Sequence, residues 1–459
     1  MKKSLVALAV LAATGAYAQS SVTLFGIVEA TTDIGYNRTQ DSTTTTNTFN
    51  AAGGGLSSVS SSTSSSQKNG MRIQDGSDQG SGSSRVGFRG TEDLGGGLKA
   101  NFLLEMGFRV DDGCTTLSAA GGPACDNGGN SANSGGSTFG RNAWGGLSGG
   151  FGEVRLGRQV LGSFAVQGNS GSSGASNGLY DASTATMAPM GGVRFSNAIR
   201  YISPNFAGFT GSLMLAAPET AANTTTSSTT ATGFVTTTGA SRRTGVDLAL
   251  EYANGPAYIG FGYNKRDAGN NLSGSSVAPA GTTAVSGIPG TTTGYTLGGA
   301  YDLGVVKPFI NYTRQKTDLS GSSAFTSVIP GGNTFTSATG DATQRALSIG
   351  LRAPVGAFTV IAGYGRSTTT ANAIVADTAL GVTTTGVNRT EAKRDAFQLG
   401  AQYALSKRTL VEANYGYNKL RGDSNTVGTS TVAGTGRVEQ FIRSNDRVSA
   451  LNVGLKHSF

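Results

Sequence analysis

Two kinds of connection alternate along the chain, and this alternation constrains the fold more than any other feature of the sequence. Short turn sequences rich in Gly, Pro, Asn and Asp begin about 50 residues apart. Long tracts rich in Ser, Thr, Gly and Asn lie between them. Seven turns and eight tracts make fifteen connections, which join sixteen segments. The turns are Gly95–Gly97, Ser148–Phe151, Pro204–Gly208, Asn254–Pro256, Asp302–Gly304, Pro354–Gly356 and Ser406–Lys407, and the tracts lie near 41–84, 111–137, 160–193, 218–242, 267–293, 317–342, 368–391 and 421–445.

The segments between these connections have the pattern of β-strands. Val22–Val28, Ala257–Tyr263 and the final Leu451–Phe459 place apolar or aromatic side chains at alternate positions. A period of two with β-branched and aromatic residues is typical of strands that bury one face. Pro308 interrupts one such segment, and because proline cannot donate a ladder hydrogen bond we expect a bulge there.

Composition and segment lengths together indicate a closed barrel in a membrane. Gly contributes 71 of the 459 residues, and charged residues are only 14% of the chain, against about 25% in soluble domains. Eight hairpins share the chain at about 55 residues each, and two membrane-spanning strands of about 9–11 residues leave about 28 for each long connection. A sheet in lipid must close so that all backbone groups are paired. We therefore predict an all-β, transmembrane, antiparallel 16-stranded β-barrel with short periplasmic turns and long extracellular loops.

The N-terminus has the features of an export signal. Lys2 and Lys3 precede the apolar run Leu5–Ala13, and Ala16–Ala18 is an A-x-A cleavage site. We expect residues 1–18 to be a signal peptide and residues 19–459 to form a single barrel domain. In an oxidising periplasm Cys114 and Cys125 favour a disulfide, because a metal site would need four ligands.

Charge and residue inventory argue against several functions. The formal net charge is +8, and the bases are not clustered, which disfavours nucleic acid as a partner. His457 is the only histidine and lies at the end of the chain, so a Ser–His hydrolase is disfavoured. We expect no enzyme activity, no metal and no cofactor. A passive channel and an adhesive surface barrel remain as alternatives.

Six stretches spread over the chain have a pattern in common with one known family. They are Ser20–Ala30, Ser84–Ala100, Gly140–Gln159, Asn197–Gly211, Tyr403–Arg408 and Val453–Phe459. Together they resemble Gram-negative general porins of the beta-proteobacterial type. The resemblance implies an outer-membrane homotrimer in contact with membrane lipid, with water-filled pores for passive diffusion of small hydrophilic solutes and ions. It also implies that the third loop, about 160–193, folds into the pore. The 41–84 tract is longer than the first loop that the family leads us to expect.

The same resemblance assigns candidate residues to the pore constriction. Arg85, Arg141 and Arg194 correspond to wall arginines that set ion preference. Arg158 begins the third loop but is a weaker candidate, because strict alternation places it on the face opposite Arg155. Asp181 is the only acidic residue of the third loop. These residues predict a modest anion preference, and the alternative is that Glu105 or Asp181 neutralises the arginines.

Aromatic residues near the segment ends predict a second feature of a membrane barrel. We expect them to form girdles at the two membrane interfaces. They are Trp144, Tyr201, Tyr252, Tyr263, Tyr312, Tyr403 and Tyr415.

Overall fold

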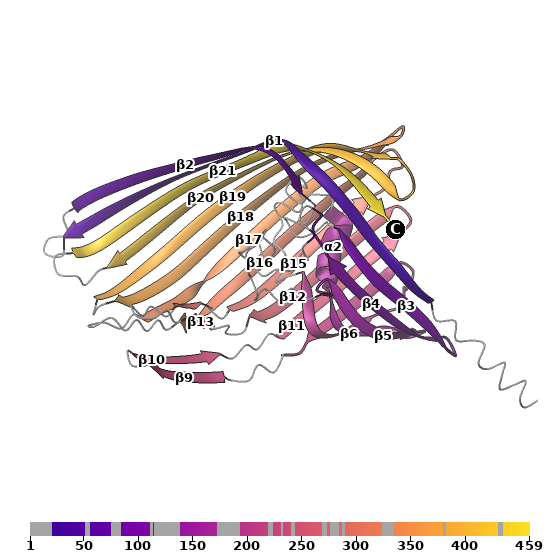
Figure 1. Ribbon diagram of the computed structural model, residues 1–459, viewed down its shortest axis with the longest axis horizontal. Helices are drawn as coiled ribbons and strands as arrows, with labels where there is room; N and C mark the ends of the chain where they lie inside the picture. Colours follow the sequence, from indigo (N-terminus) through magenta and orange to yellow (C-terminus); the bar gives the residue numbers. More distant parts are fainter. Residues whose placement is uncertain are drawn as a thin grey trace, which may run out of the picture.

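The strands form one closed antiparallel sheet, which confirms the predicted barrel (Figure 1). The computed structural model describes residues 21–50, 56–74, 84–110, 113, 138–171, 193–218, 224–230, 233–239, 244–268, 273–275, 284–286, 290–323, 335–379, 382–429 and 435–459. The elements are β1 (Ser21–Asn50), β2 (Leu56–Gln74), β3 (Arg85–Gly95), β4 (Leu98–Gly107), β5 (Asn142–Gly149), β6 (Gly152–Val160), α2 (Gly162–Gly171), β7 (Arg194–Ile202), β8 (Phe209–Ala216), β9 (Thr224–Thr230), β10 (Gly233–Gly239), β11 (Thr244–Asn254), β12 (Ala257–Ala268), β13 (Ser273–Ser275), β14 (Ala284–Ser286), β15 (Gly290–Tyr301), β16 (Lys307–Ser323), β17 (Phe335–Val355), β18 (Phe358–Ala379), β19 (Val382–Ala404), β20 (Thr409–Thr429) and β21 (Thr435–Ser458).

The described strands of this sheet fill sixteen positions around the barrel, because β2 and β3 share the position next to β1. β3 pairs with the beginning of β1, from Ser21 to Ile27, and β2 pairs with β1 from Thr31 onward. At the break between them, the Ser84 hydroxyl accepts a hydrogen bond from Glu29 N (3.0 Å) and donates one to Glu29 O (3.3 Å). β21 pairs with the other edge of β1 and closes the barrel. The β9–β10 and β13–β14 hairpins form two separate small sheets.

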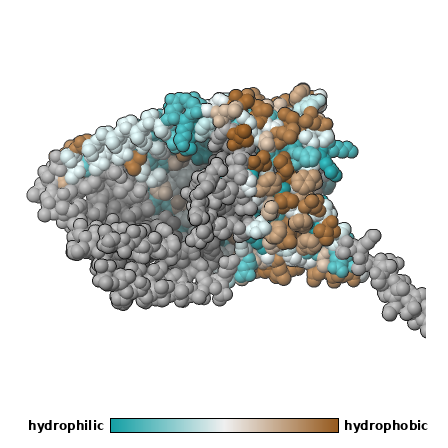
Figure 2. Space-filling view, viewed as in Figure 1, coloured by the Kyte–Doolittle hydropathy of each residue, from teal (hydrophilic) through white to brown (hydrophobic). Residues whose placement is uncertain are grey.

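The two faces of the wall have the polarity expected of a barrel in lipid. On β15 and β16, Leu297 and Ile310 are 55% and 51% exposed, whereas the adjacent Thr296 and Asn311 are buried. Apolar side chains therefore point outward and polar side chains point inward. Figure 2 shows the apolar side chains gathered in a belt around the end of the barrel that carries the short turns. Among the described residues, no helix is both long and apolar enough to cross a bilayer.

The wall is much taller on one side than on the other (Figure 1). β4 to β8 have 8 to 10 residues each, which suits the hydrocarbon layer, whereas β17 to β21 have 21 to 24 residues. The prediction that the tracts near 41–84, 317–342, 368–391 and 421–445 are long loops is therefore wrong for much of their length. Their Thr-rich stretches continue the membrane strands as paired hairpins, because Thr is β-branched and favours extended backbone.

The expected bulge at Pro308 does not form. The pairing of β16 with β17 runs without a register shift from Lys307 through Pro308 to Phe309. On the opposite edge of β16, the pairing with β15 ends at Phe309. Pro308, which lacks an N–H group, therefore needs no hydrogen-bond partner on β15.

Candidate functional site

A short helix follows the fifth wall position and lies inside the barrel. α2 begins directly after β6 and contacts the inner faces of β11, β12 and β15. Asp247 of β11 receives hydrogen bonds from Gly162 N (2.7 Å), from Ser163 N (3.2 Å) and from the Ser163 hydroxyl. A buried carboxylate at a helix N-terminus pairs the free N–H groups and interacts favourably with the helix dipole. Asp247 therefore fixes the start of α2 to the wall.

The wall below α2 is lined by glycines, which allow the helix to approach closely. A Cβ atom at Gly262 would lie 2.6 Å from Ser163 Cα, and one at Gly298 would overlap the side chain of Ser170. Ser170 accepts a hydrogen bond from Asn311 Nδ2 (2.6 Å), and Val166 is completely buried. Contacts at both ends therefore hold α2 against the wall.

Two of the predicted arginines converge on one buried carboxylate. Glu105 of β4 is 7% exposed, and its Oε1 lies 2.8 Å from Arg141 Nε and 3.4 Å from Arg85 Nε. Asn142 Nδ2 donates a hydrogen bond to the other oxygen of Glu105 at 2.5 Å. The strand order β3–β4–β5 places these groups side by side, because each strand pairs with the next. The pairing with Glu105 that the sequence left as an alternative is therefore present.

Arg194 and Arg158 extend the same group of charges. Arg194 lies within electrostatic range of Glu105 and also of Arg85, Arg141 and Arg158. Its Nε has no hydrogen-bond partner among the described residues. Arg158 donates hydrogen bonds to Gly140 O (2.7 Å) and to Ser196 Oγ (2.6 Å). We call these four arginines with Glu105 the arginine cluster.

Strict alternation fails at Arg158 for a structural reason. The pairing of β6 with β7 shifts between Gly157 and Gln159, and Gly157 has a φ of +127°. This bulge leaves Arg158 outside the regular alternation, and its side chain lines the same small cavity as Arg194. The argument that ranked Arg158 below the other arginines is therefore wrong.

A second group of inward charges lies beside the arginine cluster and was not predicted. Arg155 forms an ion pair with Glu153 (2.6 Å), and its guanidinium carbon lies 4.1 Å from the centre of the Trp144 ring. Arg200 donates hydrogen bonds to Val160 O (3.1 Å) and to Ser212 Oγ (3.0 Å). Arg155 and Arg200 stand at inward positions in the alternating pattern of their strands, and this alternation could have indicated the group.

The aromatic residues only partly follow the expected girdles. Tyr201, Tyr312, Tyr403 and Tyr415 are exposed on the outer face, as a girdle requires. Trp144 is only 9% exposed and lies beneath Arg155 on the inner face, so its assignment to a girdle is wrong.

Several predicted residues lie outside the described part of the chain. Asp181 and most of the third loop, residues 172–192, belong to this group. So do residues 1–18 and both Cys114 and Cys125. The signal peptide, the disulfide and the role of Asp181 stay predictions.

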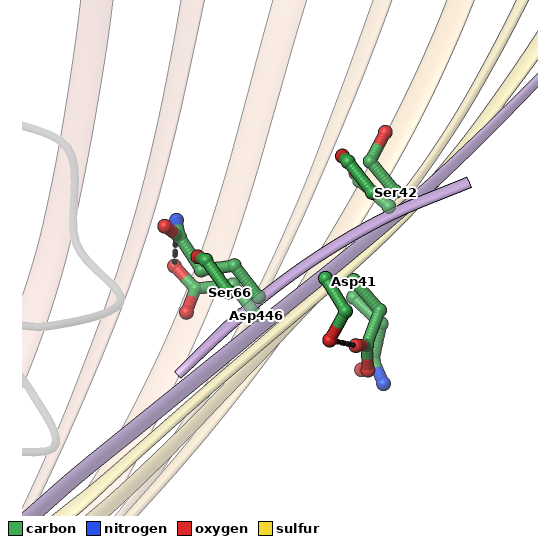
Figure 3. Close-up of a pocket in the computed structure, with 9 residues that line it drawn as sticks. Asp41, Ser42, Ser66 and Asp446 are labelled. Carbon is green, nitrogen blue, oxygen red and sulfur yellow. Dashed lines mark hydrogen bonds between the residues drawn. The ribbon is translucent and has the colours of Figure 1, made fainter. Parts of the chain in front are cut away.

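A further hollow on the extended wall does not form a single binding site. Gln40, Asp41, Ser42, Ser66 and Asp446 line it together with neighbouring residues. Figure 3 shows Asp446 and Ser66 on one side of the strands and Asp41 on the other. The two carboxylates therefore cannot bind one ligand together. No group of three or more His, Cys, Asp or Glu in the described ranges could hold a metal ion.

Comparisons with known proteins agree with the geometry. The family model for Gram-negative porins matches residues 4–423. Outer membrane porin protein 32 of Delftia acidovorans is 30% identical over 468 residues and covers 100% of both chains. An outer membrane porin protein of Bordetella pertussis is 31% identical over 430 residues, which are 91% of this chain and 94% of that one. A loop-deletion variant of OmpT, an outer membrane protein of Vibrio cholerae, has a TM-score of 0.53 at 14% identity, with 96% and 99% of the chains covered. The chain belongs to the Gram-negative porin family.

Proposed function

We propose that this outer-membrane porin, a channel for passive diffusion, has a modest preference for anions and that the arginine cluster sets it. The observation that carries the proposal is the gathering of four guanidinium groups on the inner wall. Arg85 and Arg141 pair there with the carboxylate Glu105, and Arg194 lies within electrostatic range of Glu105 and Arg158. Guanidinium stays protonated at any working pH, so the cluster keeps an excess of positive charge.

The position of the cluster makes this excess effective. In a wide, water-filled lumen, the electric field of the arginines would be screened within about 8 Å at physiological salt. α2 is held against the inner wall by Asp247 and Asn311, and we propose that it narrows the lumen beside the cluster. We propose that passing ions come within the range of the field here, where low-dielectric walls focus it.

Removal of three of the arginines is expected to abolish the preference. In the variant Arg85→Ser, Arg141→Ser, Arg194→Ser, only Arg158 and Glu105 remain of the cluster, and their charges balance. Reversal potentials across planar bilayers in a KCl gradient should show the chloride-to-potassium permeability ratio falling toward one.

A matched control removes the same charge elsewhere. Lys307, Lys407 and Arg408 are exposed at the end of the barrel with the short turns. Their replacement by Ser should leave the ratio unchanged. A cation-selective unmodified channel, or a cluster variant with the original ratio, would contradict the proposal.

We also propose that the porin is a homotrimer. Gly145 and Ala143 present small side chains on the outer face of β5, where a neighbouring wall could approach closely. Unheated protein should migrate as a trimer on detergent gels and as a monomer after boiling. Recovery of monomers alone after mild extraction would count against this assembly.

A further inference from the structure

The strand β2 forms a long edge of the sheet that no other strand of the described chain covers. Among the described strands it pairs with β1 alone, from Thr31 to Phe49. The next strand beyond β3 is β4, which ends at Gly107, the partner of Arg85. Arg85 in turn is the partner of Ile27, so β4 stops nearer the short turns than β2 begins. The backbone groups of β2 that point away from β1 are therefore open to pairing with a further strand.

The sequence of this edge lacks the features that usually protect an edge strand. Exposed edges in natural proteins carry charges, proline or bulges that prevent another strand from pairing. The stretch from Leu56 to Ser66 contains no charged residue, proline or glycine. The register of β2 with β1 runs without a shift from Ser58 to Asn69, and the apolar side chains of Leu56 and Val59 are 55% and 57% exposed. Such an edge favours the addition of a strand.

The β9–β10 hairpin offers a second edge of the same kind. Its two strands of seven residues pair with each other and form a small sheet of their own. β10 lies beside β13, so within the described chain the far edge of β9 has no neighbouring strand. Thr224–Thr230 contains only Thr and Ser, so β9 is also uncharged, and its threonines favour extended backbone.

These two edges lie at opposite borders of the short part of the barrel. We call β3 to β8, which pair in chain order, the low wall. β2 continues above β3 at one border of the low wall, and the β9–β10 hairpin follows β8 at the other. Figure 1 shows β2 and the hairpin on opposite sides of the end of the barrel that lies away from the short turns.

A ring of three copies brings these two borders together. The inference rests on the homotrimer proposed above, in which the outer face of β5, near the middle of the low wall, turns toward the neighbouring copies. Contacts in such a ring run head to tail, so one border of a low wall meets the opposite border of the next copy. We propose that β2 of one copy pairs with β9 of the next copy, as an added strand that joins the three chains outside the membrane.

Photochemical crosslinking of the purified, detergent-solubilised protein tests which strand covers β2. A benzophenone amino acid replaces Ser62, and mass spectrometry identifies the peptide to which it links after irradiation. We expect a link between two copies, with the acceptor within residues 224–230. The matched control carries the same group at Thr370, which is exposed on β18 but lies between two paired strands, β17 and β19. This control should give no link between copies.

Removal of the hairpin provides a second measurement. A variant without residues 224–239 loses β9 and β10 and keeps all strands of the barrel. Because it lacks the several hydrogen bonds of one strand pair at each contact, its trimer should dissociate in warm detergent at least about tenfold faster. Deletion of residues 273–286, which removes the β13–β14 hairpin, is the matched control and should leave the rate unchanged.

Three outcomes would overturn the proposal. They are a link from position 62 to its own copy, a link to a different segment of the neighbouring copy, and unchanged dissociation of the variant without β9 and β10. Trimers that lack the expected link contradict only this strand pairing, whereas monomers of the unmodified protein contradict the homotrimer as well. The crosslinking experiment keeps the hairpin intact, so it decides the question even if the deletion variant does not assemble.

Discussion

A Glu105→Gln channel is expected to be less stable than the unmodified channel and more selective for anions. Glu105 is the carboxylate that pairs with both Arg85 and Arg141, and it is almost fully buried. Removal of one partner of a buried ion pair typically costs about 3–5 kcal/mol, because the remaining charges lose their compensation. The same change removes the negative charge of the arginine cluster. The free energy of unfolding in urea, measured in lipid, should therefore fall. The chloride-to-potassium permeability ratio from reversal potentials should rise.

Asp318→Asn is the matched control for this prediction. Asp318 pairs with Lys316 (2.6 Å), but both side chains are about half exposed, so water and salt screen the pair and it adds little to stability. We expect this control to match the unmodified protein in both measurements. A Glu105→Gln channel with unchanged stability would show that the arginines find other compensation, and unchanged selectivity would show that the cluster does not face the ion path.

A Gly298→Leu channel is expected to conduct less than the unmodified channel. Gly298 faces α2 from β15, and even a Cβ atom there would overlap the Ser170 side chain. Forcing additional atoms into a packed contact typically costs about 1–3 kcal/mol, which α2 can avoid by leaving the wall. A helix displaced from the inner wall of a closed barrel moves toward the axis of the lumen and obstructs it more. Single-channel conductance in planar bilayers should fall and become less uniform between channels.

The adjacent Gly299 provides the control, because it points to the other face of the same strand. A Cβ atom at Gly299 would approach only Tyr258 O, at an ordinary 3.5 Å. Gly299→Leu should therefore conduct like the unmodified channel. Equal conductance of both leucine variants and the unmodified channel would mean that α2 does not limit the pore.

The sequence predicted the barrel because its evidence was repeated sixteen times. No single strand distinguishes a membrane barrel from a soluble sandwich, since Leu297 beside Thr296 would suit either. The alternation of short and long connections was the decisive signal, and the structure confirms the closed sheet. Arg85, Arg141 and Arg194 were found through a family resemblance, and their common neighbour Glu105 was found only as an alternative.

Features that depend on the register between strands could not be predicted from local sequence patterns. The bulge that redirects Arg158 comes from the pairing of β6 with β7, which no window of sequence contains. The Ser- and Thr-rich tracts have the composition of loops, but long-range pairing makes much of them strand. Trp144 looked like an interface residue because it is aromatic and near a strand end. Its inward direction became clear only from the ring contact with Arg155.

Because β2 and β3 share one wall position, the chain can be longer without increasing the circumference of the pore. The pore width depends on the number of wall positions, and the described strands fill sixteen of them although two segments occupy one. The chain passes from β2 to β3 without adding a position, and the Ser84 hydroxyl pairs with the Glu29 backbone at the break. Insertions at this point can thus lengthen the chain, and diversify the surface that the cell presents, at constant channel diameter.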